Sequence, residues 1–564
     1  MQNHLREIIE ILLSTDSPTR RNVEQAKFKV TKKYRLGYVP SNSELLALLT
    51  PEERIKLVPI LRRKATRALS GVNVVAVMTE PLECPHGRCA FCPGGPDNDS
   101  PQSYTGHEPA AMRGAQNAFN PYDQVRSRVK QLEAIGHTVD KIDLIVMGGT
   151  FPASPIDYQR GFIKGCLDAI TLQPSATLEE AKLNSEKSVT KNVGITFETR
   201  PDQLEPENVD SMLGLGCTRV EIGVQNVYDD IYELVDRGHT VQHVIDGTRV
   251  MKDSGLKICY HMMPGLPGSN MDRDLEGYKR IFEDPLFKPD MLKIYPTLVC
   301  EGTRLYDWWK SGDYTPFTNE DGIDLISKVK EMIPPWIRVM RIQRDIPIHQ
   351  ISAGITKSHI RELVKLRLKE HGKRCNCIRC REVGHKARDG IEIDPDSLSL
   401  VHRTYDASGG TEDFISAEDR NETLVGFIRL RMPGENPHRP EITSNTGIIR
   451  ELHVYGRMTP VGQGGSDWQH KGWGERLMEE AEKTARERYD MDRMVVDVAA
   501  MCGSPGQFYY GVEASLGHEA SQLANDAIVA KMKEAPERHI GLGTVPLQDT
   551  DLAIKELKRC INEL

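Results

Sequence analysis

The stretch Glu83-Cys84-Pro85-His86-Gly87-Arg88-Cys89-Ala90-Phe91-Cys92-Pro93-Gly94-Gly95 decides how the rest of this sequence is interpreted. Four residues separate its first two cysteines and two separate the second from the third, so three thiolates lie close enough to share a metal site. One interpretation is a zinc knuckle with a fourth ligand from elsewhere, because closed zinc sites have four ligands. The other is a cubane iron–sulfur cluster held by three cysteines, which leaves one iron open to a ligand. The spacing alone allows both.

From residue 71 onward, short apolar strands alternate with segments of helical length. This alternation predicts a parallel sheet whose strands are connected by helices. The sequence has no dinucleotide-binding fingerprint, which argues against a doubly wound sheet. Residues 71–345 are therefore predicted to form a partial (β/α)6 barrel. The predicted strands cover residues 72–79, 142–147, 193–198, 219–224, 257–263 and 292–295, and residues 336–342 are a further candidate.

Unusual residues lie at the end of nearly every predicted strand. In barrels of this kind the chemistry gathers at the C-terminal ends of the strands. Any one of these residues could make a turn or a structural ion pair, but their recurrence at one rim predicts a functional site. They are Gly148, Gly149 and Thr150 after the second strand, Glu198 and Arg200 at the end of the third, Gln225 after the fourth, and Lys293 within the sixth.

Several longer motifs follow the cysteine loop along the chain. They are Gln102-Ser103-Tyr104-Thr105-Gly106, Gly194-Ile195-Thr196-Phe197-Glu198-Thr199-Arg200-Pro201-Asp202, Glu221-Ile222-Gly223-Val224-Gln225, Lys293-Ile294-Tyr295-Pro296 and Arg344-Asp345-Ile346-Pro347. Together with the cysteine loop, these motifs resemble those of radical S-adenosylmethionine (SAM) enzymes and, more narrowly, those of the catalytic-subunit family of Elongator, which modifies the wobble uridine of tRNA. The resemblance extends from the N-terminal basic region to about Tyr510.

The resemblance implies a [4Fe–4S] cluster whose open iron binds the amino and carboxylate groups of SAM. A 5′-deoxyadenosyl radical would then take hydrogen from the methyl group of acetyl-CoA. The carbon radical would add to carbon 5 of the wobble uridine, and hydrolysis of the thioester would leave a carboxymethyl group. Cys84, Cys89 and Cys92 are the implied cluster ligands, Gly148, Gly149, Thr150, Glu198, Arg200 and Gln225 the implied SAM contacts, and Lys293 an implied catalytic residue.

Two other functions are consistent with parts of the sequence. A protein lysine acetyltransferase with a structural iron–sulfur cluster would use only the acetyl-CoA half of the chain. An RNA-binding scaffold would treat both enzymatic halves as vestigial.

Two basic regions stand out in a chain whose net charge is −8. Residues 1–70 carry 14 Lys/Arg against 7 Asp/Glu, and residues 336–390 carry 14 against 5. Basic blocks on an otherwise acidic protein indicate a polyanionic partner, although solvated helix faces are the simpler alternative. Residues 1–70 are predicted to be helical, and Ser41 and Glu44 have capping-box spacing. Cations interleaved with aromatic rings suit RNA there, and the predicted contacts are Lys27, Lys29, Lys32, Lys33 and Arg35.

A second cysteine cluster lies in the linker predicted for residues 346–390. Cys375, Cys377 and Cys380 fall within six residues, which favours tetrahedral zinc with a fourth ligand from elsewhere. A second iron–sulfur cluster is less favoured, because one residue between two ligands is cramped for a cubane. The fourth ligand is left open among His349, His359, His371 and His385.

Residues 391–520 are predicted to form an acetyltransferase domain. The run Gln469-His470-Lys471-Gly472-Trp473-Gly474 precedes a predicted helix at 475–489, and a glycine turn at a helix N-terminus presents amide groups to phosphate. The run resembles the pyrophosphate loop of the GNAT acetyltransferase superfamily, which implies acetyl-CoA as ligand. Further implied contacts are Glu451, Leu452, His453 and Val454, and the pair Tyr509 and Tyr510 is implied as a general acid or, alternatively, as core packing.

Composition and patterning also lead to expectations about the compartment, membrane segments and partners of the protein. Twelve cysteines, six of them in two tight clusters, suggest metal sites in a reducing compartment, so we expect the cytoplasm. No apolar run approaches the roughly 18 residues of a membrane span, and no signal peptide is expected. The expected partner is the anticodon stem-loop of tRNA, with a homodimer or Elongator-like accessory subunits as further candidates. Residues 521–564 have no counterpart in the resemblance and are given no role.

Overall fold

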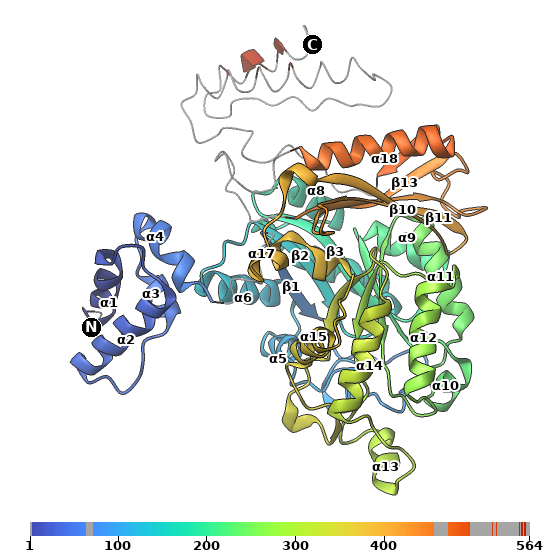
Figure 1. Cartoon of the computed structure of the whole chain (residues 1–564), viewed down its shortest axis with the longest axis horizontal. Helices are drawn as coiled ribbons and strands as arrows, with labels where there is room; N and C mark the ends of the chain where they lie inside the picture. The colour runs from blue at the N-terminus through green and yellow to red at the C-terminus, as the bar shows by residue number, and fades with distance from the viewer. Residues whose placement is uncertain are drawn as a thin grey trace. The chain divides into compact units, whose positions relative to one another are not determined.

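The computed structural model describes residues 3–63, 71–455 and 472–496, with isolated residues between 522 and 559. The chain divides into two compact units, one of Met1–Arg457 with Trp468–Val498 and one of Met458–Asp467 with Ala499–Leu564. Every helix and strand named below belongs to the first unit (Figure 1). None of the helices in the described ranges is long and apolar enough to cross a bilayer.

A seven-stranded parallel sheet forms the centre of the first unit, with its strands side by side in chain order. The prediction of a partial barrel is confirmed, since the two outermost strands do not pair with each other. The strands in the middle of the sheet are buried on both faces, whereas the two strands at its N-terminal edge alternate between buried and more exposed residues. The strands are β1 (Val72–Met78), β2 (Lys141–Met147), β3 (Lys191–Thr199), β4 (Arg219–Gln225), β5 (Lys257–Met262), β6 (Met291–Ile294) and β8 (Arg338–Ile342), the last at the further candidate strand.

Helices connect these strands and cover the outer face of the curved sheet (Figure 1). Their apolar stripes and the sheet together form one large buried core. A small antiparallel pair, β7 (Leu298–Val299) with β9 (Ala353–Gly354), follows β6. The helices are α5 (Pro109–Gln116), α6 (Pro121–Ala134), α7 (Ile156–Thr171), α8 (Leu178–Lys187), α9 (Pro206–Gly214), α10 (Asp229–Leu234), α11 (Val241–Asp253), α12 (Met271–Glu283), α13 (Arg304–Ser311), α14 (Asn319–Met332) and α15 (Ile360–Glu370).

The N-terminal region is helical, as predicted, and has its own core. The predicted capping box opens its third helix: the Ser41 hydroxyl accepts from the Glu44 amide at 3.2 Å, and the Glu44 carboxylate accepts from the Ser41 amide at 2.7 Å. Arg62 Nε donates to the carbonyl oxygen of Gly136 at 3.0 Å and connects the region to the barrel. The helices are α1 (Asn3–Ser14), α2 (Arg20–Tyr34), α3 (Asn42–Ala47) and α4 (Pro51–Leu61).

A second sheet of five strands follows the two short helices α16 (Ile378–Arg381) and α17 (Val383–Arg388). Its first four strands are antiparallel and the last pairs parallel to the fourth. The helix α18 (Trp473–Tyr489) packs across it. The strands are β10 (Ser399–Ala407), β11 (Gly410–Glu418), β12 (Leu424–Met432), β13 (Thr446–Val454) and β14 (Arg493–Val496).

Buried charges join the second sheet to the barrel. Arg450 of β13 donates to both carboxylate oxygens of Asp290, at 2.7 and 2.6 Å, and Arg431 of β12 donates to Asp253 at 2.8 Å. Burial alone would raise the pKa of Asp290, but its cationic neighbours lower that pKa well below its usual range. We call this set the buried charge network; its members are Lys252, Asp253, Asp290, Glu412, Arg429, Arg431 and Arg450.

The network lies at the N-terminal ends of the barrel strands. Asp290 directly precedes β6, its carboxylate accepts from the Ile258 amide of β5 at 2.9 Å, and its carbonyl accepts from the Arg338 amide of β8 at 3.0 Å. Arg450 also donates to the carbonyl of Leu256, just before β5. The second sheet therefore covers the end of the barrel opposite to the C-terminal rim.

Candidate functional site

The cysteine loop follows β1 at the C-terminal rim of the barrel. Cys89 and Cys92 are buried and Cys84 is half-buried, and all three are free thiols. The sulfur atoms of these three cysteines, all within the described residues, do not all lie within 4.8 Å of one another. A single tetrahedral zinc holds its sulfur ligands only about 3.8 Å apart, whereas in a cubane each cysteine binds a different iron. The wider spacing favours the cubane.

A cavity opens at this rim, with roughly 1020 Å³ of empty space including its mouth. The three cysteines of the loop line it, so the cluster loop and the predicted rim belong to one site. Tyr104 belongs to one of the quoted motifs but had no predicted role. Inside the cavity, its hydroxyl donates to Glu198 Oε2 at 2.6 Å. The predicted SAM contacts in its lining are Gly149, Thr150, Glu198, Arg200 and Gln225.

Several buried polar atoms of the cavity wall have no hydrogen-bond partner within the described protein. Both terminal nitrogens of Arg200 are unpartnered although the side chain is only 2% exposed, and Gln225 Oε1 and Thr199 Oγ1 are unpartnered too. Burial and the nearby Arg237 lower the pKa of Arg200. Leaving a buried charged donor unsatisfied is costly, so these atoms fit a polar ligand such as SAM, whose carboxylate suits a guanidinium.

Close backbone packing shapes the same wall. Gly148 has φ +141°, and a Cβ there would lie 1.9 Å from Thr79 Oγ1. Gly149 has φ +91°, and a Cβ there would lie 3.1 Å from the carbonyl oxygen of Gln102. Both positions require glycine, which brings the end of β2 directly against the segments that frame the cavity.

Lys293 lies behind the cavity wall in an ion pair. Its amine donates to Glu221 Oε2, which also accepts from His261 Nε2 at 2.9 Å. Burial would raise the pKa of Glu221, but Lys293 and His261 lower it well below its usual range. The pKa of Lys293 is raised by Glu221 against the effect of burial. Lys293 is therefore a fixed cation here, while Glu221 and His261 reach the cavity.

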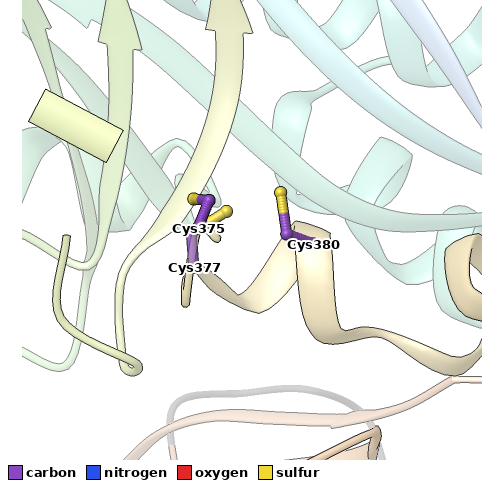
Figure 2. A group of neighbouring side chains, drawn as sticks. All are labelled: Cys375, Cys377 and Cys380. Carbon is purple, nitrogen blue, oxygen red and sulfur yellow. The ribbon is translucent and has the colours of Figure 1, made fainter. Parts of the chain in front are cut away.

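Cys375, Cys377 and Cys380 converge from the loop before α16 and from α16 itself (Figure 2). Their sulfur atoms lie within 4.8 Å of one another, which suits a single metal ion. In the described part of the chain, none of the four candidate histidines joins this set. The buried Lys330 donates to Cys380 Sγ at 3.7 Å instead, and thus places a positive charge beside the thiolates.

The predicted RNA contacts all lie on or next to α2, but they differ in exposure. Lys29, Lys32 and Arg35 are exposed, and Lys33 pairs with Glu7 at 2.8 Å. Lys27 is only 5% exposed and donates to Asn42, so its amine does not face solvent as the RNA prediction assumed. Phe28 is 71% exposed next to these cations.

The predicted acetyl-CoA contacts lie on β13 and at the start of α18. Glu451 accepts from Arg429 Nε at 2.9 Å, the His453 ring stacks near Phe427, and Leu452 is exposed. Gly472, with φ +76°, precedes Trp473 and Gly474 at the beginning of α18. Gln469, His470, Lys471, Tyr509 and Tyr510 lie outside the described residues.

Four family models match the chain. They are the ELP3 N-terminal domain at residues 1–69, the Radical SAM superfamily at 82–278, the Radical_SAM C-terminal domain at 289–370 and the Acetyltransferase (GNAT) family at 385–501. Elongator complex protein 3 of Danio rerio is 45% identical, over 84% of this chain and 88% of the relative. The chain belongs to the Elongator complex protein 3 family.

Other members of the Elongator complex protein 3 family agree in sequence and in structure. A protein named tRNA uridine(34) acetyltransferase, from Methanocaldococcus jannaschii, is 50% identical over 85% of this chain and 90% of the relative. The solved structure of archaeal Methanocaldococcus infernus Elp3 with an N-terminal deletion is 44% identical. It covers 79% of this chain and 96% of its own, with a TM-score of 0.68.

The family models that match the chain indicate which cofactors it binds. The radical SAM match implies a [4Fe–4S] cluster and SAM, and the GNAT match implies acetyl-CoA. The structure adds wall residues that had no predicted role: His86 and Gln102 lie within the quoted motifs, and Arg237 and His261 lie outside them. Arg237 and His261 reach the site through contacts between residues far apart in the chain, and no local motif marks Arg237.

Proposed function

We propose that this protein modifies the wobble uridine of tRNA, forming a carboxymethyl group at carbon 5 from acetyl-CoA by a 5′-deoxyadenosyl radical mechanism. The observation that carries the proposal is the cavity in which three loop cysteines meet the unpartnered buried atoms of Arg200 and Gln225. A GNAT-type domain in the same chain supplies a reason for a second, acetyl-CoA-derived substrate. Relatives named tRNA uridine(34) acetyltransferase support the nucleic-acid substrate.

The cofactors, when bound, supply the radical and the two-carbon unit. Cys84, Cys89 and Cys92 would hold the cluster and leave one iron for SAM. Arg200 would pair with the SAM carboxylate, and Gly149 would let the backbone approach the ligand. Thr150, Glu198 and Gln225 would complete the polar contacts, and the buried wall would exclude water from the reacting groups.

The remaining assignments concern the predicted catalytic and acetyl-CoA residues. Lys293, as a permanent cation on Glu221, would fix the charge of the cavity floor rather than accept a proton. Gly472 at the beginning of α18 would approach the pyrophosphate of CoA. The other proposed acetyl-CoA contacts are Glu451, Leu452, His453, Val454, Gln469, His470, Lys471, Trp473, Gly474, Tyr509 and Tyr510.

An anaerobic assay tests the proposal. Protein with reconstituted cluster, reductant, SAM, acetyl-CoA and an anticodon stem-loop RNA should give 5′-deoxyadenosine and a uridine heavier by a carboxymethyl group. Acetyl-CoA carrying deuterium in its methyl group should transfer label to 5′-deoxyadenosine. Acetylation of peptides without RNA, at a rate independent of the cluster, would instead support the lysine acetyltransferase alternative.

The exposed cations of α2 are proposed to contact RNA phosphates. Replacing both Lys29 and Lys32 with glutamine should weaken stem-loop binding and lower the slope of log K against log salt by up to about 2, since each phosphate contact contributes about 1. Fluorescence anisotropy over a salt series measures this slope. Lys187 on α8 and Lys279 on α12 are both exposed and, replaced together, are the matched control. An unchanged slope in the α2 variant would contradict the assignment.

We further propose that Cys375, Cys377 and Cys380 bind structural zinc, with Lys330 stabilising the thiolates. Metal analysis should find about one zinc per chain, and Cys380→Ser should lose it while cluster iron remains. Cys166→Ser, at a buried cysteine outside both clusters, is the control for losing a thiol. Iron in place of zinc at this site would overturn the metal assignment.

The cellular context follows from the same reasoning. We propose that the protein works in the cytoplasm, where thiols stay reduced. The anticodon stem-loop is the proposed RNA partner, with a homodimer or Elongator-like accessory subunits completing the assembly. The proposed regions are 1–70 for RNA binding, 71–345 for the radical barrel, 346–390 for the zinc linker and 391–520 for the acetyltransferase.

A further inference from the structure

The three cysteines of the loop have different hydrogen-bond partners. Cys84 Sγ lies 3.4 Å from the hydroxyl of Thr150, and Cys92 Sγ accepts from the Ser103 amide at 3.3 Å. Cys89 Sγ instead accepts from the guanidinium of Arg237, with Nη1 at 3.4 Å, and lies 3.1 Å from His86 Nε2. Within the described residues, Cys89 is therefore the loop cysteine with a hydrogen bond from a permanently charged donor.

Arg237 is held in this position by several contacts. The side chain is buried, with 6% exposed, and its backbone amide donates to the carbonyl of Tyr232 at 2.8 Å. Its second terminal nitrogen donates to the carbonyl of Gly223 in β4. A Cβ on Gly223 would lie 2.7 Å from that nitrogen, so a larger residue at position 223 would push the guanidinium away from its present place.

We propose that Arg237 raises the reduction potential of the cluster through its hydrogen bond to Cys89. This inference rests on the proposed function, because it takes the three-cysteine loop to hold a [4Fe–4S] cluster. Arg237 acts through the ligand sulfur.

The physical reason is electrostatic. Reduction adds one negative charge to a cluster that three thiolates already make anionic, and a buried cation one hydrogen bond from a ligand sulfur stabilises the added charge. Hydrogen bonds to the sulfurs and local net charge are among the factors that set cluster potentials. A guanidinium keeps its proton at any physiological pH, so Arg237 is a permanent cation beside Cys89.

Arg200 is the other cation nearby, and it has a different environment. Its Nε donates to Asp202 at 2.9 Å, while both terminal nitrogens are free to meet a ligand. Arg237 uses its terminal nitrogens on Cys89 and Gly223. The two arginines thus divide the tasks of binding the ligand and tuning the cluster.

A redox titration monitored by electron paramagnetic resonance tests this division without measuring turnover. In Arg237→Gln, with the cluster fully loaded, we expect the ratio of reduced to oxidised cluster at the wild-type midpoint to fall at least tenfold. For a one-electron couple this corresponds to a downward shift of about 59 mV. Arg237→Lys should shift the midpoint less, since it keeps the charge. Arg249→Gln, at an exposed arginine of α11, is the control for loss of a positive charge and should leave the midpoint unchanged.

Gly223→Ala provides a second test that keeps the arginine. The added methyl group should displace the guanidinium from Cys89 and lower the midpoint in the same direction. A loaded cluster with the wild-type midpoint in both Arg237→Gln and Gly223→Ala would overturn the inference alone. A wild-type protein that binds no iron and sulfide at the loop would overturn the proposed function, and the inference with it.

Discussion

Replacing Cys89 with alanine should abolish formation of both 5′-deoxyadenosine and modified uridine. Cys89 is the central cysteine of the loop, is 6% exposed, and lies in the cavity wall with its two neighbours. Two remaining thiolates cannot hold three irons of a cubane while leaving the fourth for SAM. We expect a loss of activity to the detection limit, measured by mass spectrometry of nucleosides and of 5′-deoxyadenosine.

Two measurements separate this loss from unfolding. Cluster iron should fall in Cys89→Ala, whereas zinc and the thermal unfolding transition should stay near wild type. Cys166→Ala, at a fully buried cysteine of α7, should keep the cluster and the activity. Uridine modification that survives in a cluster-free Cys89→Ala protein would rule out the radical mechanism.

Replacing Asp290 with asparagine should destabilise the protein by about 3–5 kcal/mol, because it removes one charge from a buried, paired set. Asp290 is fully buried and forms a bidentate pair with Arg450, and Lys252 and Arg429 lie 3.8 and 3.7 Å from it. The substitution keeps the shape and leaves these cations with one carboxylate fewer. Denaturation by guanidinium chloride, followed by circular dichroism, measures the shift in midpoint.

The same substitution at an exposed ion pair is the control. Asp210 pairs with Arg439 at 2.6 Å and is about half exposed, so Asp210→Asn should cost at most about 1 kcal/mol. Equal effects of the two substitutions would show that the buried charge network contributes little. Arg450→Met together with Asp290→Asn should restore part of the stability, since neither charge of the pair is then left alone.

The barrel could be predicted from sequence because its strands contain short apolar stretches that alternate with segments of helical length. Residues 74–78 of β1 and 144–147 of β2 are unbroken apolar stretches, and the cysteine spacing marks the loop after β1. The strands β10 and β11 were not predicted. In β11 the buried positions include Glu412, Asp413 and Glu418, which pair with arginines. Because these buried residues are charged, the strand lacks the apolar pattern from which it could have been predicted.

Side chains whose roles depend on distant partners were harder to assign. Lys27 was expected to bind RNA, yet it shares the buried face of α2 with Val23, Ala26 and Val30. That apolar spacing was visible in the sequence and could have excluded it. Arg237 gave no such signal, because its partner Cys89 is 148 residues away in the chain.

The buried charge network has a consequence for modularity. The barrel and the acetyltransferase sheet resemble separate families, and each would be expected to fold from its own stretch of sequence. Cutting the chain between them would leave Asp253 and Asp290 on one piece without the arginines that pair with them, and Arg429, Arg431 and Arg450 on the other piece without these two carboxylates. The two domains could therefore be replaced by those of a relative only together. We expect them to unfold in a single cooperative transition.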